Sequence, residues 1–525
     1  MKNKKIGFTL IELLAVIIVL AIIALIATPI IFNVIENAKI KSLENSCYGV
    51  IDAVRTKYAE ELLNLNKITN GNVNELTVSG EKPIDGTWTI DNSKDSEQRG
   101  IKIDNVRFSS MKDYACSNDL ETGKVSCKKT YKDNSSANTP ILFKNMVPIK
   151  YENNKWIIAD LGQKWYDYDA KEWANAVVLN SGVTKNVGDE VTEEEISLWY
   201  VWIPRYKYTI FNGNNESAAA QLINVTFESG VSRTGTVTCS DNADGSETCT
   251  DSTNGLIKNG TSTYTHPAFK FGNTELTGFW VGKFEVSGST SIITVKPNVT
   301  SLRSQTVSSL FTAIQKVKTI YGINNADSHM MKNMEWGAVA YLKQSKYGLG
   351  TTDIGINNNS NYITGCGATA ESASSTTCNK YNTTTGMLAS TTGNIYGVYD
   401  MSGGAYEYVM GNMKNSSNAF YPNGSGFKTV PDSKYYDVYM YGEGTQTNYH
   451  ARGKLGDATK EILVRFNYNA GGWYKDHSYF VKDTYSWLSR GGGHSGTSSA
   501  GIFYFNGVNG GASNYYSTRA VLSSK

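Results

Sequence analysis

The chain has 525 residues and is almost neutral, with 50 Lys and Arg residues against 48 Asp and Glu residues. Hydrophobic residues make up 40% of the composition and aromatic residues 11%, which is enough for about two or three folded domains and excludes a disordered protein. Because no long run of Lys or Arg follows the first residues, we expect no nucleic acid as partner.

The N-terminal stretch has three parts. Lys2, Lys4 and Lys5 form a basic tip, residues 7–12 read Gly-Phe-Thr-Leu-Ile-Glu, and residues 13–32 form an uncharged run rich in Ile, Leu, Val and Ala. A helix of that length crosses a hydrocarbon core of about 30 Å, so we expect the chain to begin in a membrane.

This pattern resembles the processing motif of type IV prepilins. The resemblance implies that a membrane peptidase cuts between Gly7 and Phe8, that Phe8 is then N-methylated, and that Glu12 meets the Phe8 ammonium group of a neighbouring subunit. Thr28 and Pro29 stand where pilins commonly carry a helix-interrupting proline. The implied partners are prepilin peptidase and other pilin subunits, with the protein first in the cytoplasmic membrane and then in a pilus at the cell surface. An uncleaved signal anchor is the alternative.

An amphipathic helix is predicted to continue the membrane helix. Apolar residues recur every three or four positions between polar ones: Ile40, Leu43, Cys47, Val50, Val54, Tyr58 and Leu62. We expect this stripe to pack on a small head, as in type IV pilins, with Cys47 as a buried free thiol. An intersubunit disulfide through Cys47 is the alternative.

Short segments with turn residues between them follow from about residue 66 to residue 132 and predict a small antiparallel sheet. Six of the seven cysteines in the chain fall into local pairs, which points to disulfides in an extracytoplasmic protein, although spacing alone leaves other pairings open. We expect no metal site, because the five histidines are scattered and no cysteines have CxxC spacing. The expected pairs are Cys116 with Cys127, Cys239 with Cys249, and Cys366 with Cys378.

A polar run at residues 133–140 ends in proline and is interpreted as a linker. Beyond it the chain is rich in aromatic residues, and strands are expected around residues 156–158, 198–206 and 279–286. At this density we interpret the large aromatic side chains as core rather than as a ligand cage.

Several segments of the C-terminal part resemble the formylglycine-generating enzyme or sulfatase-modifying-factor family, which has a C-type-lectin-like fold. They are residues 278–286, 334–341, 394–408, 489–493 and 517–522, and the third is the most specific. The resemblance covers roughly residues 140 to 525. The chain departs from the family in one respect: the aerobic enzymes use two redox cysteines in their C-terminal region, whereas Cys378 is the last cysteine here. Without that thiolate we expect no catalysis and assign no catalytic residue.

Two arginines in these segments, Arg490 and Arg519, are expected to form buried pairs with carboxylates such as Glu407 or Asp400 and to serve the scaffold. Residues 495–516 combine Gly, Ser, Ala, Asn, Tyr and Phe, a composition typical of binding loops. The expected ligand contacts are Tyr504, Asn506, Asn509, Asn514, Tyr515 and Tyr516.

The sequence thus predicts an α+β protein: a leader (residues 1–7), a membrane and filament helix (8–64), a small pilin-like head (65–138) and a loop-rich domain that resembles formylglycine-generating enzyme (139–525). We expect a minor or tip pilin that acts as an adhesin for a glycan or protein, because a subunit this bulky packs poorly along a filament. No cofactor is expected, and a structural calcium ion is left open. The alternatives are an enzyme on the same fold and a pseudopilin of a secretion or DNA-uptake system.

Overall fold

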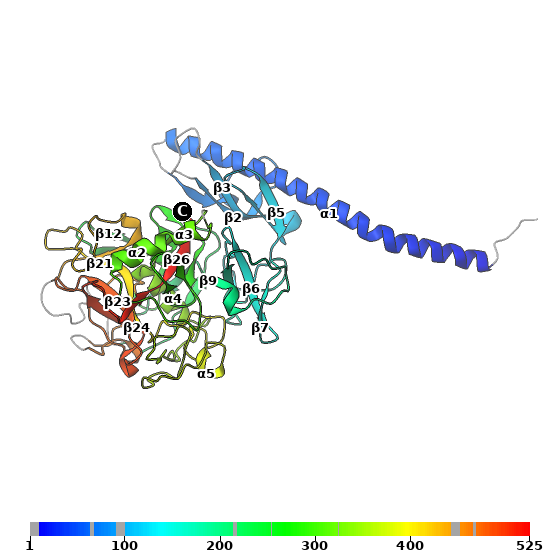
Figure 1. Cartoon of the computed structure of the whole chain (residues 1–525). Coiled ribbons are helices and arrows are strands. Elements are labelled where there is room, and N and C mark those ends of the chain that lie inside the picture. Colours follow the sequence, from blue (N-terminus) through cyan, green and yellow to red (C-terminus); the bar gives the residue numbers. More distant parts are fainter. Residues whose placement is uncertain are drawn as a thin grey trace, which may run out of the picture. The chain divides into compact units, whose positions relative to one another are not determined.

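The structure, a computed structural model, describes residues 10–63, 68–90, 100–213, 218–253, 255–323, 325–442, 452–465 and 469–525. The chain divides into two compact units (Figure 1). Unit 1 consists of Met1–Ile68 and Val73–Lys129, and unit 2 consists of Thr69–Asn72 and Thr130–Lys525. The predicted processing residues Gly7 and Phe8 lie outside the described residues.

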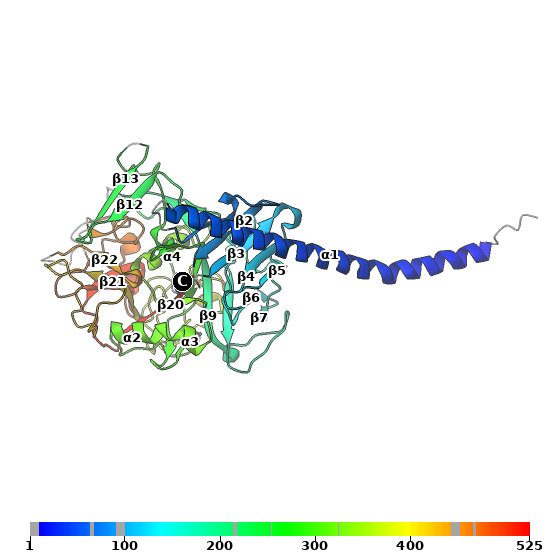
Figure 2. The same cartoon turned by 90° about the horizontal axis from the view of Figure 1, so that it is seen from above.

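Unit 1 is built on one long helix, α1 (Leu10–Leu63), which curves along its length and continues through Pro29 (Figures 1 and 2). The predicted membrane helix and amphipathic helix are therefore one element. Its second half carries the predicted stripe, in which Leu43, Cys47 and Val50 are buried, whereas in its first half apolar side chains such as Leu10 and Phe32 are exposed. Within the residues that the structure describes, no helix combines the length and the apolar character that a membrane crossing requires. The span predicted for residues 13–32 therefore stays a prediction.

The sheet of unit 1 packs against the stripe on α1. Its strands β2 (Pro83–Ile90), β3 (Ile101–Phe108), β4 (Tyr114–Asn118) and β5 (Val125–Lys129) pair in this order, each antiparallel to the next. The predicted small antiparallel sheet is thus present, and Trp88, Val106 and Phe108 supply its apolar core.

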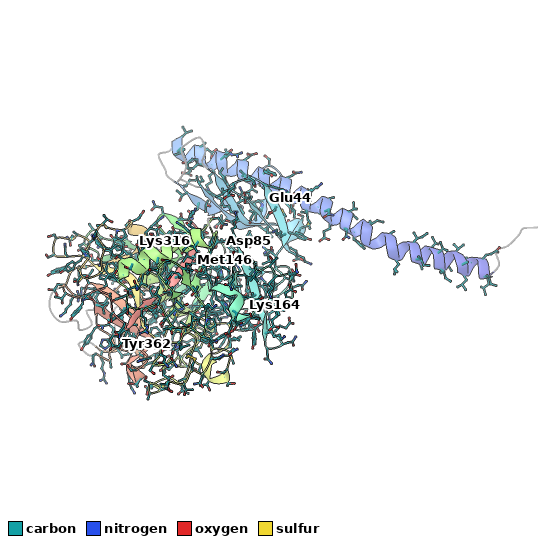
Figure 3. All side chains as sticks on the ribbon, viewed as in Figure 1. Glu44, Asp85, Met146, Lys164, Lys316 and Tyr362 are labelled. Atoms are coloured by element: carbon teal, nitrogen blue, oxygen red, sulfur yellow. A yellow bond between two sulfur atoms is a disulfide. The ribbon has the colours of Figure 1, made fainter. Side chains whose placement is uncertain are left out.

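A disulfide and a third sulfur lie inside this core. Cys116 on β4 is bonded to Cys127 opposite it on β5. Cys47 of α1 is a buried free thiol, as predicted, and its sulfur lies within 4.8 Å of both disulfide sulfurs. Burial, together with the negative charge of Glu44 (labelled in Figure 3), raises the pKa of the Cys47 thiol to about 12. The thiol is therefore protonated at neutral pH.

Unit 2 is centred on a seven-stranded antiparallel sheet in the order β20-β26-β17-β9-β8-β6-β7. Trp199, Trp202 and Trp280 are almost fully buried in it, which confirms that the aromatic residues form a core. The sheet joins the first strands of the unit to the last strand of the chain. Its strands are β6 (Met146–Glu152), β7 (Lys155–Ile158), β8 (Asn175–Leu179), β9 (Ile196–Pro204), β17 (Gly278–Gly282), β20 (Asp327–Met330) and β26 (Ala520–Ser523).

A second, mixed sheet carries the C-terminal segment. Its strands β22 (Asp437–Tyr439), β21 (Tyr406–Met413), β23 (Trp487–Gly491) and β24 (Gly501–Val508) pair in this order, and β25 (Tyr516–Thr518) pairs with β21 in parallel. Within its described residues, unit 2 has two longer helices, α2 (Val307–Gln315) and α4 (Asn333–Lys343), and two short ones, α3 (Val317–Ile320) and α5 (Thr384–Met387). The α+β class is confirmed.

Short strands complete unit 2. β10 (Tyr206–Thr209) pairs with β11 (Val225–Phe227) and β14 (Thr263–Thr265), and β12 (Val237–Asp241) pairs with β13 (Glu247–Asp251), where the predicted Cys239–Cys249 disulfide is present. Two further hairpins consist of β15 (Lys270–Phe271) with β16 (Thr274–Glu275) and β18 (Ser287–Gly288) with β19 (Ile293–Thr294).

The polar run at residues 133–140 is not a linker. The division between the units comes at Lys129–Thr130, and the run is packed into unit 2. The Asp133 carboxylate accepts a hydrogen bond from the Tyr168 backbone N–H at 3.2 Å, and the Asn138 side chain donates to the carbonyl oxygens of Gly230 and Thr277 at 3.0 Å. These polar side chains satisfy buried backbone groups, a role that composition does not distinguish from solvent exposure.

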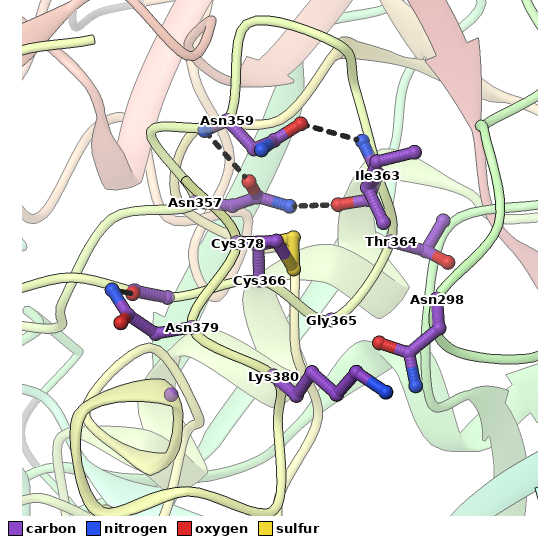
Figure 4. The surroundings of a disulfide bond; sticks show 12 residues. Asn298, Asn357, Asn359, Ile363, Thr364, Gly365, Cys366, Cys378, Asn379 and Lys380 are labelled. Atoms are coloured by element: carbon purple, nitrogen blue, oxygen red, sulfur yellow. Dashed lines mark hydrogen bonds between the residues drawn. A yellow bond between two sulfur atoms is a disulfide. The ribbon is translucent and has the colours of Figure 1, made fainter. Parts of the chain in front are cut away.

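The predicted Cys366–Cys378 disulfide is also present, in a loop between α4 and β21 (Figure 4). Beside it, the Asn357 side chain donates to the Ile363 carbonyl oxygen at 2.9 Å, and the Asn359 backbone N–H donates to the Asn357 side chain at 3.1 Å (Figure 4). Cys366, Asn357 and Asn359 are almost fully buried, so this Ser/Thr/Asn-rich segment is internally hydrogen-bonded and packed.

Candidate functional site

The C-terminal segment of unit 2 rests on a buried ionic cluster. The Arg519 guanidinium donates to both carboxylate oxygens of Glu407, at 2.5 and 3.1 Å, and to the carbonyl oxygens of Gly282 and Tyr399 at 2.7 and 2.8 Å. Burial raises the pKa of Glu407 to about 7 and also raises the pKa of the neighbouring Asp400. The predicted carboxylate pair of Arg519 is therefore present, and it joins the second sheet to the end of the chain.

Arg490 behaves differently from the prediction. Its guanidinium is fully buried and donates to the Asn333 side-chain oxygen at 2.7 Å and to the carbonyl oxygens of Ala458 and Tyr504 at 3.0 and 3.3 Å. Burial lowers the pKa of Arg490 to about 10. Backbone carbonyls of a loop and of β24 thus take the place of the expected carboxylate, and sequence pattern does not reveal such partners.

The six predicted ligand contacts lie on β24, on β25 and in the loop between them. Asn509, Asn514 and Tyr515 are exposed, and the Tyr515 side chain has 53% of its surface accessible. Asn506 and Tyr516 are half-buried. Tyr504 is only 5% exposed, because β24 turns its ring inward against His477 and Tyr406. Tyr504 therefore supports the surface and offers little contact area of its own.

Several aromatic rings from distant parts of the chain meet at this place. Tyr516 stacks on Tyr408 with ring centroids 4.6 Å apart and packs against Tyr406 at 5.3 Å. Gly493 lies so close to Tyr406 that a Cβ atom there would come within 2.7 Å of the ring. We call Tyr406, Tyr515 and Tyr516, together with the exposed Asn514, the tyrosine surface.

A stack of three side chains lies beside the tyrosine surface. The Arg303 guanidinium carbon lies 3.8 Å from the ring centroid of Tyr362, and the His494 ring lies 4.6 Å from the same ring. Arg303 also donates a hydrogen bond to the Asn514 carbonyl oxygen. We call Arg303, Tyr362 and His494 the cationic stack. Sequence reasoning missed Arg303 and Tyr362, because only the folded chain brings them to the C-terminal segment.

The loop that carries Asn509 to Tyr515 is hydrogen-bonded to the scaffold along its length. The carbonyl oxygen of Gly510 accepts from the Val307 N–H at 3.1 Å, that of Ser513 accepts from the Ser304 N–H at 2.9 Å, and that of Tyr515 accepts from the Tyr406 N–H at 2.9 Å. A loop fixed in this way loses little conformational entropy when a ligand binds.

Candidate metal ligands occur in two groups within the described residues: Cys47 with Cys116 and Cys127, and Glu247 with Cys239 and Cys249. In each group two sulfurs are bonded to each other as a disulfide, so they are not the thiolates that a metal ion requires. The predictions that concern cofactors and calcium stay predictions.

At the other end of the described chain, Glu12 is exposed in the first turn of α1. The exposed position leaves Glu12 accessible to a neighbouring subunit.

Comparisons with known proteins bear on this end of the chain. The family described as the prokaryotic N-terminal methylation motif matches residues 2–28. The chain is also 32% identical over 116 residues to prepilin peptidase-dependent protein A of Clostridium perfringens (strain 13 / Type A), a match that covers 20% of this chain and 83% of that protein. The predicted pilin-like N-terminus is thus confirmed. With most of the relative's length matched, the chain belongs to the family of prepilin peptidase-dependent proteins.

Proposed function

We propose that this protein is a minor or tip pilin that displays unit 2 at the cell surface as an adhesin. The methylation motif implies processing by prepilin peptidase and assembly with other pilins. The exposed apolar side chains on the first half of α1, such as Leu10 and Phe32, are consistent with that assembly, since neighbouring helices would cover them.

Unit 2 is, in this proposal, a C-type-lectin-like domain related to formylglycine-generating enzyme that binds without catalysing. In support, residues of the resembling segments lie on neighbouring strands, because β17 pairs with β26 and β21 pairs with β23. The last cysteine of the chain, Cys378, is bonded to Cys366 and supplies no free thiolate. These features favour a binding role over the enzyme alternative.

The observation that carries the proposal is the tyrosine surface. It presents the exposed Tyr515 ring and the Asn514 side chain on a loop whose backbone is fixed to the scaffold at Gly510, Ser513 and Tyr515. Tyrosine gives amphipathic contact area at low entropic cost, and asparagine gives adaptable hydrogen bonds. A glycan or a protein surface is the ligand class that such a surface fits.

Two measurements test the proposal. Mass spectrometry of protein sheared from intact cells should find an N-terminal peptide that begins at N-methylated Phe8. Cells that carry Tyr515→Ala should adhere to a target surface several-fold less than wild type. Leu222→Ala is the matched control, since Leu222 of unit 2 is as exposed as Tyr515 and lies outside the tyrosine surface. Retention of Met1 would overturn the pilin assignment, and equal adhesion of all three strains would overturn the assigned surface.

A further inference from the structure

We propose that Arg303 of the cationic stack binds the carboxylate of an acidic sugar, and that the adjacent hydroxyl-lined groove along α2 holds further sugar units of the same oligosaccharide. This inference rests on the proposed adhesin function and assigns its ligand class. It adds Arg303 and residues of the groove, which lie far before the predicted contacts in the chain and outside every segment used in the sequence analysis.

Arg303 carries a positive charge that no carboxylate neutralises within the described residues. Its recorded partners are the Tyr362 ring and the Asn514 carbonyl oxygen, and its Nε atom is buried with no hydrogen-bond partner. A guanidinium with open donors recognises a carboxylate in a planar, two-point geometry.

The backbone at Tyr362 supports a role beyond packing. Tyr362 has a φ of 57°, in the left-handed region of the backbone that residues other than glycine rarely adopt. Two hydrogen bonds hold it there: its N–H donates to the Asn359 carbonyl oxygen at 2.9 Å, and its own carbonyl accepts from the Ser301 N–H at 3.0 Å. This strained position presents the ring to Arg303 and His494. Strain of this kind persists where the surrounding structure holds a functional geometry.

A polar groove lies along α2, and one of its lining residues, Gln305, follows Arg303 by two positions. Its cavity of about 320 Å³ is lined mainly by hydroxyl side chains, with one amine and no carboxylate: Thr290, Ser291, Gln305, Ser308, Ser309, Thr312, Ala313 and Lys316. Gln305 connects the two places, because its side-chain amide donates to the Arg303 carbonyl oxygen at 3.4 Å and its backbone bridges to Ser513. The volume lies in the range of small-molecule sites, roughly 300–1,000 Å³.

The chemistry of the two places selects the ligand. Arg303 offers a positive charge, and the cavity along α2 offers mainly hydroxyl groups. An oligosaccharide with an acidic unit brings a carboxylate to the first and hydroxyl groups to the second. Its acidic unit would lie at Arg303, with its ring against the tyrosine surface, and its neutral units would exchange hydrogen bonds with the hydroxyls of α2. An acidic peptide would form few hydrogen bonds with those hydroxyl groups, so we favour a saccharide.

The test measures binding to the full-length protein by isothermal titration calorimetry at physiological salt. The probes are sialyllactose, with a terminal acidic unit, trigalacturonate, with acidic units throughout, and neutral lactose. We expect at least one acidic probe to bind about tenfold or more tightly than lactose, the difference that one charge-assisted hydrogen bond gives. Which acidic probe binds better tells a chain-terminal acid from a polymeric one.

Variants separate the outcomes. Arg303→Gln should weaken binding of the acidic probe roughly tenfold to a hundredfold, and Arg303→Lys should recover only part of the loss. Arg233→Gln is the matched control, since Arg233 also lies at the surface of unit 2 but pairs with Glu275 at 2.6 Å, and it should bind as wild type. Equal binding of lactose, unchanged binding by Arg303→Gln, or failure of both acidic probes would overturn the inference. If adhesion still depends on Tyr515 in any of these cases, the adhesin function stands and only the acidic sugar is wrong.

Discussion

Replacing Arg519 by methionine should destabilise unit 2 by about 3–5 kcal/mol at pH 8, the usual cost of removing one partner of a buried ion pair. The variant leaves the Glu407 carboxylate without its counterion and removes the donors to the Gly282 and Tyr399 carbonyl oxygens, which Arg519 reaches at 2.7 and 2.8 Å. Since a whole domain is stable by only about 5–15 kcal/mol, the effect should be plain in urea unfolding. Tryptophan fluorescence follows this transition through the buried Trp199 and Trp280.

The pH dependence makes this prediction sharper. The folded-state pKa of Glu407 is raised to about 7 from an ordinary value of 4.5. A carboxyl with a raised pKa contributes stability that is fully present below 4.5 and is lost as the pH rises through 7. Without Arg519 the pKa of Glu407 should rise further. The loss in free energy of unfolding caused by Arg519→Met should therefore be smaller at pH 5, where Glu407 is protonated. Arg303→Met is the matched control and should change stability by only about 1 kcal/mol, since it removes a ring contact and a part-exposed hydrogen bond to the Asn514 carbonyl oxygen but no ion pair. A deficit under about 1 kcal/mol for Arg519→Met at pH 8, or the same deficit at pH 5 and pH 8, would refute this account of the cluster.

Further predictions concern His329, the disulfide of Figure 4 and the free thiol. Burial lowers the pKa of His329, but the neighbouring carboxylates of Glu335 and Asp327 outweigh it and raise the pKa to about 9. The free energy of unfolding should therefore fall as the pH rises from 6.5 through 9, and His329→Gln should remove that fall. Replacing Cys366 and Cys378 by serine should cost unit 2 about 3 kcal/mol in urea unfolding, from loop entropy at a sequence separation of 12. Iodoacetamide should alkylate Cys47 only in urea, as peptide mass spectrometry would show; rapid labelling of the native protein would contradict its burial.

The features predicted correctly from the sequence depend on residues that are close together in the chain. The stripe that includes Leu43, Cys47 and Val50 is buried on α1, and all three cysteine pairs are bonded. A helical period and two cysteines about ten residues apart each depend on local geometry, so little other information is needed. A carboxylate partner for Arg519, such as Glu407, was also expected, because a buried guanidinium needs a charge-paired acceptor.

Features that depend on long-range contacts were missed. The polar run around Asp133 and Asn138 had the composition of a linker but satisfies buried backbone groups. Tyr504 had the composition of a contact residue, yet the pleat of β24 turns it inward. Arg303 and Asn514 are 211 positions apart in the chain, and nothing local in either segment points to the other. Burial and partnership of this kind are decided by the tertiary packing that periodicity does not record.

The three disulfides limit how far the chain can extend under tension. The Cys116–Cys127 bond closes a loop with a sequence separation of 11 between Cα atoms 4.0 Å apart. Drawn out, that loop would lengthen the chain by about 35 Å, since each residue spans at most about 3.3–3.6 Å. The disulfide prevents this extension under tension, and the other two disulfides do the same in unit 2. Tension therefore runs through each disulfide and bypasses the residues of the loop that it closes. A stretched chain extends less than its number of residues implies.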